Sequence, residues 1–152
     1  MTIVLNPPKT ASVTPVDPSH YALVKDEFGR CLIKPTFFED FYKEFIGKSS
    51  EIGRMFANTE MSSQKEALRA GLTFLIMYAE GKSPFATEKL DKLGASHKRT
   101  RLNVRPDMYP LWIQSLIATV RKHVPTFNET SLKAWQTVLQ NGVNRIVSHY
   151  ND

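Results

Sequence analysis

The chain has 152 residues, of which 41% are hydrophobic, and both figures are ordinary for one soluble domain. No stretch approaches 18 consecutive apolar residues, and the start lacks a basic head followed by a long apolar run, so neither a membrane-spanning helix nor a secretory signal is expected. The single cysteine excludes an internal disulfide and fits a cytoplasmic location.

The net charge of +5 would suit an anionic partner, but most of the basic residues are scattered along the sequence. The one dense run is Lys98, Arg99, Arg101 and Arg105. No helix-turn-helix signal or series of stacking aromatic residues accompanies it, so the sequence does not favour nucleic acid as a partner.

The first 16 residues contain three prolines and few large apolar side chains, which predicts a flexible N-terminal leader. From residue 17 to residue 152 the apolar spacing is helical, and no convincing strand alternation appears. The sequence therefore predicts one all-helical domain over 17–152.

In the first half, a cap residue followed by proline predicts a helix that starts at Asp17-Pro18 and ends near residue 34. A second helix is expected over about 36–47, with glycine as its stop. Ser49 or Ser50 should cap a short helix that reaches Phe56.

In the second half, the apolar spacing predicts a long helix over about 61–80 and another over 87–98. The Arg105-Pro106-Asp107 step should open the next helix, which runs to about His123. Thr126 and Glu129 resemble a capping box at the start of the last helix. Six or seven unequal helices with short connections favour a pocket-forming fold over a plain four-helix bundle.

Among the four histidines, His97 has a distinctive position. The other three lie at predicted helix ends, whereas His97 follows Leu93 by four residues and so shares the apolar face of its helix. A neutral imidazole is a common iron ligand. Taken alone, however, a histidine in such a place is most simply a structural residue.

The neighbours of His97 extend this reading. The run LDKLGASHKRTRLNVRPDMYPLW resembles the bacterial single-domain globins and the globin part of flavohaemoglobins. In that family a leucine lies four residues before the proximal histidine, and a branched apolar residue precedes a Pro-acid-x-Tyr-Pro run. Leu93, Val104 and the stretch from Pro106 to Pro110 match those positions. The resemblance implies a globin fold around a haem b pocket, with His97 as the iron ligand and Leu93, Val104 and Tyr109 beside the haem.

The resemblance continues upstream, where FYKEFIGKSSEIGRMFANTEMSSQKEAL is similar to the distal half of those globins, and it covers about residues 19–150. It implies that Phe56 packs on the haem face and that Tyr42, Gln64 and Leu68 lie on the ligand side. Without the resemblance, Tyr42 would be a buried core tyrosine, Gln64 a solvated residue of a first helical turn, and Phe56 and Leu68 core residues.

Two further side chains are candidates for contact with the haem or its ligand. Ser96 either hydrogen-bonds the imidazole Nδ1–H or a propionate, or it is an exposed helix serine. Arg101 either pairs with a haem propionate or belongs to a solvated basic face. The tryptophans are most simply core, and Cys31 is expected to be inert.

The implied function is reversible binding of O2, or of another diatomic gas such as NO or CO, at a ferrous haem. The phenol of Tyr42 and the amide of Gln64 would donate hydrogen bonds worth about 1.5–3 kcal/mol to the bound ligand. Storage, sensing and NO dioxygenation with an external reductase all fit this chemistry, in a monomer or a homodimer. A second class remains open: a haem-free, globin-like interaction or sensor module that acts through dimerisation.

Overall fold

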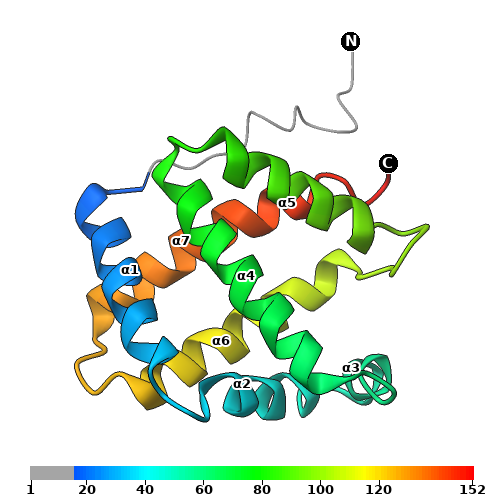
Figure 1. The fold of residues 1–152 in the computed structure, drawn as a ribbon, viewed down its shortest axis with the longest axis horizontal. Coiled ribbons are helices and arrows are strands. Elements are labelled where there is room, and N and C mark those ends of the chain that lie inside the picture. The colour runs from blue at the N-terminus through cyan, green and yellow to red at the C-terminus, as the bar shows by residue number, and fades with distance from the viewer. Residues whose placement is uncertain (1–15) are drawn as a thin grey trace.

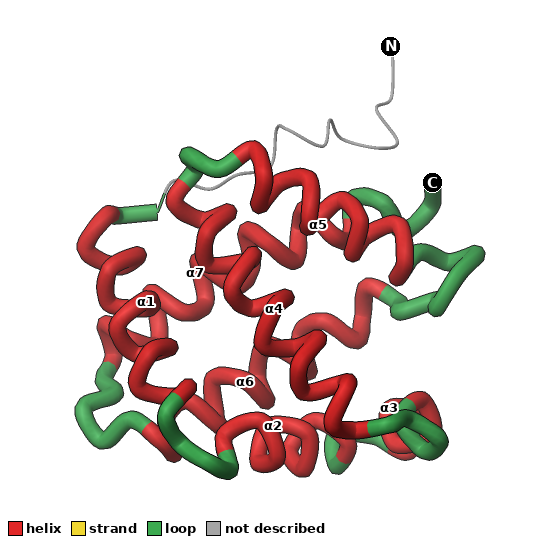
Figure 2. The backbone as a smooth tube through the Cα atoms, viewed as in Figure 1, coloured by secondary structure: helices red, strands yellow, loops and turns green. Residues whose placement is uncertain are grey.

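The computed structural model describes residues 16–152, so the predicted leader over 1–16 lies outside the described residues except for Val16. Within that part the chain forms seven α-helices and one short 3-10 helix, with no strand. The all-helical prediction is therefore confirmed (Figures 1 and 2). The helices are α1 Pro18–Leu32, α2 Phe37–Ile46, α3 Ser50–Met55, α4 Met61–Glu80, α5 Pro84–His97, η1 Pro106–Met108, α6 Tyr109–His123 and α7 Glu129–Val147.

Local signals set most of these boundaries as predicted. The Asp17 carboxylate accepts a hydrogen bond from the Ser19 backbone N–H and caps α1, whose first residue is a proline. Ser49 does the same for α3 by accepting from the Ile52 N–H. The long helix α4 ends at Gly81, which has a φ of 80°. That left-handed conformation is one that glycine adopts without a Cβ clash.

Two boundaries differ from the prediction. Helix α5 begins at Pro84 rather than near residue 87, because Ser83 caps it by accepting from the Ala86 N–H. The last helix is capped by Asn128, not by Thr126. The Asn128 side chain accepts from the Ser131 N–H, and the Ser131 hydroxyl accepts from the Asn128 N–H. The capping box is thus present, but it starts two residues later than predicted.

Helix α7 is the centre of the packing, since it contacts α1, α4, α5 and α6. Figure 1 shows α4 passing across α7, and α2 lying along α6 at the other side of the molecule. The core between them includes the fully buried side chains of Phe37, Phe41, Leu72, Leu116 and Trp135. Burial of such side chains contributes about 1.5–3 kcal/mol each, so this core is the main source of stability.

A buried carboxyl group ties α1 to α7. Glu27 is only 2% exposed, and its two oxygens accept hydrogen bonds from Ser131 Oγ and Trp135 Nε1, each at 2.9 Å. A buried acidic group without such partners would be strongly destabilising. Between residues 16 and 152, no helix combines the length and the apolar character needed to cross a bilayer.

Candidate functional site

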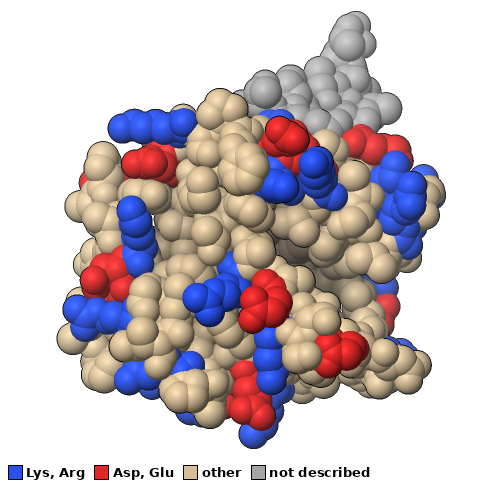
Figure 3. Space-filling model, in the orientation of Figure 1, with Lys and Arg blue, Asp and Glu red and all other residues tan. Residues whose placement is uncertain are grey.

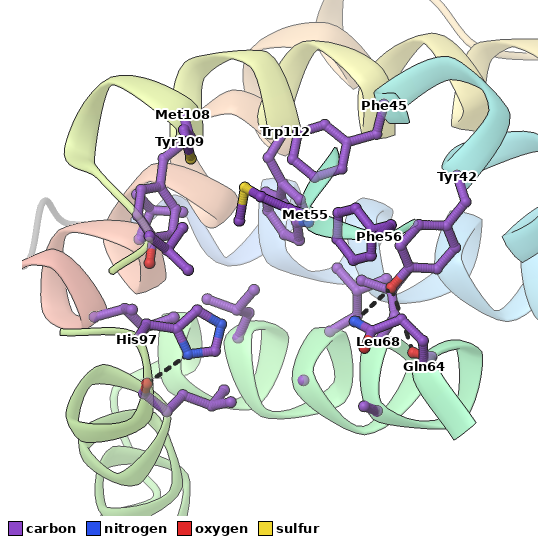
Figure 4. Close-up of a pocket in the computed structure, with 18 residues that line it drawn as sticks. Tyr42, Phe45, Met55, Phe56, Gln64, Leu68, His97, Met108, Tyr109 and Trp112 are labelled. Atoms are coloured by element: carbon purple, nitrogen blue, oxygen red, sulfur yellow. Dashed lines mark hydrogen bonds between the residues drawn. The ribbon is translucent and has the colours of Figure 1, made fainter. Parts of the chain in front are cut away.

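A deep apolar pocket opens where α4 and α5 diverge. Side chains from α2, α3, α4, α5, α6 and α7 line it, and the space between them is about 900 Å³, counting the part open to solvent. Figure 3 shows the surface hollowed between α4 and α5, and Figure 4 shows the lining side chains. Pockets of this apolar character commonly hold an organic group with a few polar contacts.

His97 enters the pocket from the last residue of α5. Its Nδ1 lies 2.8 Å from the Leu93 carbonyl oxygen, which can only accept, so Nδ1 carries the proton and donates. In the neutral ring Nε2 then keeps a lone pair, and within residues 16–152 no hydrogen bond reaches it. Burial lowers the pKa of His97 and so favours the neutral imidazole. The hydrogen bond to the Leu93 carbonyl raises the pKa and offsets this effect only in part.

Tyr42 and Gln64 lie at the opposite end of the pocket from His97 (Figure 4). Gln64 Nε2 donates to the Tyr42 oxygen at 3.0 Å, and the Tyr42 hydroxyl donates to the Gln64 backbone carbonyl at 3.3 Å. Burial raises the pKa of Tyr42 to about 12, although the Gln64 hydrogen bond lowers it. The phenol therefore keeps its proton at neutral pH and can donate it.

Five other predicted side chains also line this pocket: Phe56, Leu68, Leu93, Val104 and Tyr109. Burial raises the pKa of Tyr109, whose ring lies at the His97 end in Figure 4. The Ser96 hydroxyl is exposed and lies outside the lining, yet it is 2.9 Å from His97 Nδ1 and donates to the Leu93 carbonyl. The exposed Arg101 is also outside the lining.

Several lining residues were not expected at the site from the sequence, among them Met55, Met108 and Trp112. Met55 is the last residue of α3 and is 38% exposed, whereas Met108 is 5% exposed. Trp112 was expected to be core, and it packs against Phe41 while reaching the pocket. In the sequence, only the Tyr109-Pro110 step indicated that α6 would face the site.

An ion pair joins two walls of the pocket. Both Nη atoms of Arg105 donate to the Glu51 carboxylate, which belongs to α3, and Nη2 does so at 2.8 Å. Arg105 also holds Asp107 through Nε at 3.1 Å. These bonds lower the pKa of Glu51 and raise that of Arg105. Each partner is about 40% exposed, so the pair orients the two segments more than it stabilises the fold.

The donor set of the pocket fits a group that brings most of its own iron ligands. His97 offers one nitrogen, and residues 16–152 contain no group of three His, Cys, Asp or Glu side chains that could hold a bare metal ion. An iron porphyrin supplies four nitrogens and needs one axial imidazole and an apolar slot. The residues present fit haem on both counts.

An all-helical fold around such a pocket is the arrangement of a protein that can hold a large, mostly apolar cofactor. The globin family profile matches residues 36–146, which is more than half of the chain. The chain belongs to the globin family, and membership implies haem binding. A comparison with curated proteins finds no match.

One solved structure is similar to this chain over most of its length. It is the crystal structure of the protein PA3967 from Pseudomonas aeruginosa PAO1, which is described as structurally highly homologous to a human hemoglobin. The two chains are 39% identical, with a TM-score of 0.82, and the match covers 88% of this chain and 99% of PA3967. The expected likeness to bacterial single-domain globins is thereby confirmed.

Proposed function

We propose that this globin binds haem b with His97 as its axial iron ligand and binds O2 or another diatomic gas beside Tyr42 and Gln64. The observation that carries the proposal is the position of the His97 Nε2 lone pair, in an apolar pocket whose far end holds a phenol and an amide. Haem, when bound, supplies an iron that can take O2, NO or CO at a position left open by a single protein ligand.

The hydrogen bonds around His97 prepare it for this role. Donation from Nδ1 to the Leu93 carbonyl fixes the ring orientation and makes Nε2 a better electron donor. Ser96 acts with that carbonyl, because its hydroxyl lies within hydrogen-bond distance of both groups. Phe56, Leu68, Leu93, Val104 and Tyr109 would flank the planar group and exclude water from it.

Tyr42 and Gln64 would stabilise a ligand that carries partial negative charge. The 3.3 Å bond from the Tyr42 hydroxyl to the Gln64 carbonyl is long, so little is lost when the hydroxyl turns toward a ligand. Gln64 has a second amide N–H to donate while the first stays on Tyr42. Donors to such a ligand are worth about 1.5–3 kcal/mol, which suits tight binding and slow release.

The physiological role that follows is O2 storage, O2 sensing, or NO dioxygenation supported by an external reductase. Arg101 stays a prediction as a partner of a haem carboxylate, as do a cytoplasmic location and a monomeric or homodimeric state. The haem-free module has no observation in its favour, since its dimer interface would not require an imidazole facing a phenol across a pocket.

The test is a titration of purified apoprotein with haem, followed by visible spectra of the ferric, ferrous and CO forms. We expect one haem per chain and a spectrum of single-histidine ligation. His97→Ala should lose haem retention, and added imidazole should restore the spectrum. His20→Ala, a change in α1 outside the pocket, is the matched control. Unchanged spectra for His97→Ala would remove His97 as the ligand, and a colourless, folded product would favour the haem-free module.

A further inference from the structure

The segment 98–105 after α5, here called the basic loop, gathers four cations, and among the described residues only one of them, Arg105, forms an ion pair. From residue 92 to residue 106 there are five Lys and Arg residues and no Asp or Glu. Some surface cations elsewhere pair along their own helix, as Arg30 does with Asp26, whereas others are spread singly over the described surface. Within the described chain, Lys98, Arg99 and Arg101 take part in no ion pair. Figure 3 shows Lys and Arg side chains gathered at the molecular edge beyond the end of α5.

An exposed leucine lies among these cations. Leu102 is 66% exposed, although leucine is a residue that folded proteins usually bury. Its neighbours Arg99, Arg101 and Asn103 are also exposed. An exposed apolar side chain flanked in sequence by exposed polar and charged residues matches the composition of protein interfaces, where an apolar centre is surrounded by a polar rim.

The basic loop has a fixed backbone. The N–H groups of Arg101 and Asn103 both donate to the Lys98 carbonyl, at 2.9 and 3.0 Å. Arg99 N–H donates to the Tyr150 carbonyl at 2.9 Å, and the Tyr150 hydroxyl donates to Asn103 Oδ1 at 2.6 Å. A partner would therefore meet Leu102 in a preset position and would not have to order the loop on binding.

The inner side of the same loop is attached to the pocket wall. Leu102 N–H donates to the Ser96 carbonyl at 3.2 Å, and Val104 N–H donates to the His97 carbonyl at 3.0 Å. Val104 also lines the pocket. A molecule that covers Leu102 would thus contact a loop whose backbone is hydrogen-bonded to His97 and to the residue before it.

We propose that the basic loop, with Leu102 at its centre, is the docking surface for a small acidic protein of the kind that carries single electrons. The proposal rests on the proposed function, because a haem globin that turns over needs an electron source. Nucleic acid is a poorer fit, since residues 98–105 offer no aromatic side chain for base stacking. A membrane is also a poorer fit, because one leucine gives little apolar surface to bury in lipid.

The test measures binding of an acidic flavodoxin to the haem-reconstituted protein by calorimetry and by surface-immobilised kinetics, at low and at physiological ionic strength. The loop variant is Arg99→Glu with Arg101→Glu. The matched control is Lys25→Glu with Lys133→Glu, which makes the same charge change at two exposed positions on α1 and α7. Haem content is read from the absorption of each sample, so loss of haem and loss of docking are separate observations.

We expect the loop variant to weaken flavodoxin binding by on the order of tenfold or more at low salt and to remove most of its salt dependence. Leu102→Ser should raise the dissociation rate with little change in the association rate. If the control variant weakened flavodoxin binding equally, the loss would be due to the net charge of the protein and not to the basic loop, and the proposal would be overturned. So would absence of flavodoxin binding at low salt. The proposal also fails if the loop variant loses only binding to duplex DNA or to phosphatidylglycerol vesicles, each assayed in parallel.

Discussion

Replacing Tyr42 with phenylalanine separates the ligand-binding role of its hydroxyl from its structural role. In the apoprotein the change removes one ordinary hydrogen bond, from Gln64 Nε2 at 3.0 Å, and one long bond at 3.3 Å. A neutral hydrogen bond of this kind contributes about 0.5–1.5 kcal/mol to the free energy of unfolding. For a chain of this size, each kcal/mol lost lowers the Tm by roughly 2–4 °C. The apoprotein should therefore stay folded.

The effect on a bound ligand should be larger. If the hydroxyl donates to a partly charged O2, its loss costs about 1.5–3 kcal/mol, so the O2 dissociation rate should rise by about ten- to a hundredfold. Stopped-flow replacement of O2 by CO measures that rate. Tyr21→Phe is the control, because it removes a half-buried hydroxyl from α1, outside the pocket. Gln64→Leu, alone and combined with Tyr42→Phe, gives the coupling between the two donors.

An O2 dissociation rate for Tyr42→Phe within twofold of that of the unsubstituted protein would refute this reasoning. It would mean that the hydroxyl keeps its bond to the Gln64 carbonyl when the ligand is present. A rise in the rate accompanied by an equal rise for Tyr21→Phe would point to a general loosening of the fold instead of a lost donor.

Three further predictions concern stability. Hydrogen bonds at the start of α4 lower the pKa of Glu60 to about 2 from its ordinary 4.5. The stability that the ionised Glu60 contributes is therefore complete above pH 4.5 and is lost as the pH falls toward 2. In a pH series of thermal melts, the difference in Tm between this protein and Glu60→Gln should close over that range. Gly94→Ala should destabilise by about 1–3 kcal/mol in urea unfolding, because its Cβ would lie 2.5 Å from the His149 ring and 2.9 Å from a backbone oxygen. Trp135→Phe should cost at least about 2 kcal/mol in the same assay, since a buried indole and its bond to Glu27 are lost together.

The same chain supplies controls for these changes. Glu66→Gln, which removes the charge of an exposed glutamate of α4 that caps nothing, is the matched control for Glu60→Gln. Gly29→Ala places a Cβ in open space within α1, so it should stabilise by about 0.5–1 kcal/mol. A neutral Gly94→Ala or a pH-independent Glu60→Gln would contradict the packing and capping described for α5 and α4.

The sequence predicts helices well where a boundary is set by one residue. The bounds of α4 match the prediction because a single residue, Gly81, ends the helix by taking the left-handed conformation. The start of α5 was placed too late, although the Ser83-Pro84 step is itself a start signal. At α7 several residues of the stretch TFNETS can cap a helix, and the sequence does not show that the chain still turns at Phe127, whose N–H donates to the Val124 carbonyl.

The sequence predicts a pocket residue when its side chain has distinctive chemistry, and misses it when only the packing of the helices brings it to the pocket. His97, Tyr42 and Gln64 carry distinctive chemistry, so the resemblance to globins could assign them before any fold was seen, and the structure brings them to one pocket. Met55 and Met108 reach the pocket through the angles between helices, which apolar spacing does not report. Arg101 lies on the exposed loop outside the lining, and its pairing with a propionate stays a prediction.

The bond between Arg105 and Glu51 has a consequence for how the pocket is filled. Met55 of α3 and Val104 before η1 both line the pocket, so any entry of a planar group that moves these two segments apart has to break the pair. The pair is exposed enough for dissolved ions to compete with it. Concentrated salt should therefore hasten both arrival and departure of the cofactor, so the rate of exchange can change without a matching change in affinity.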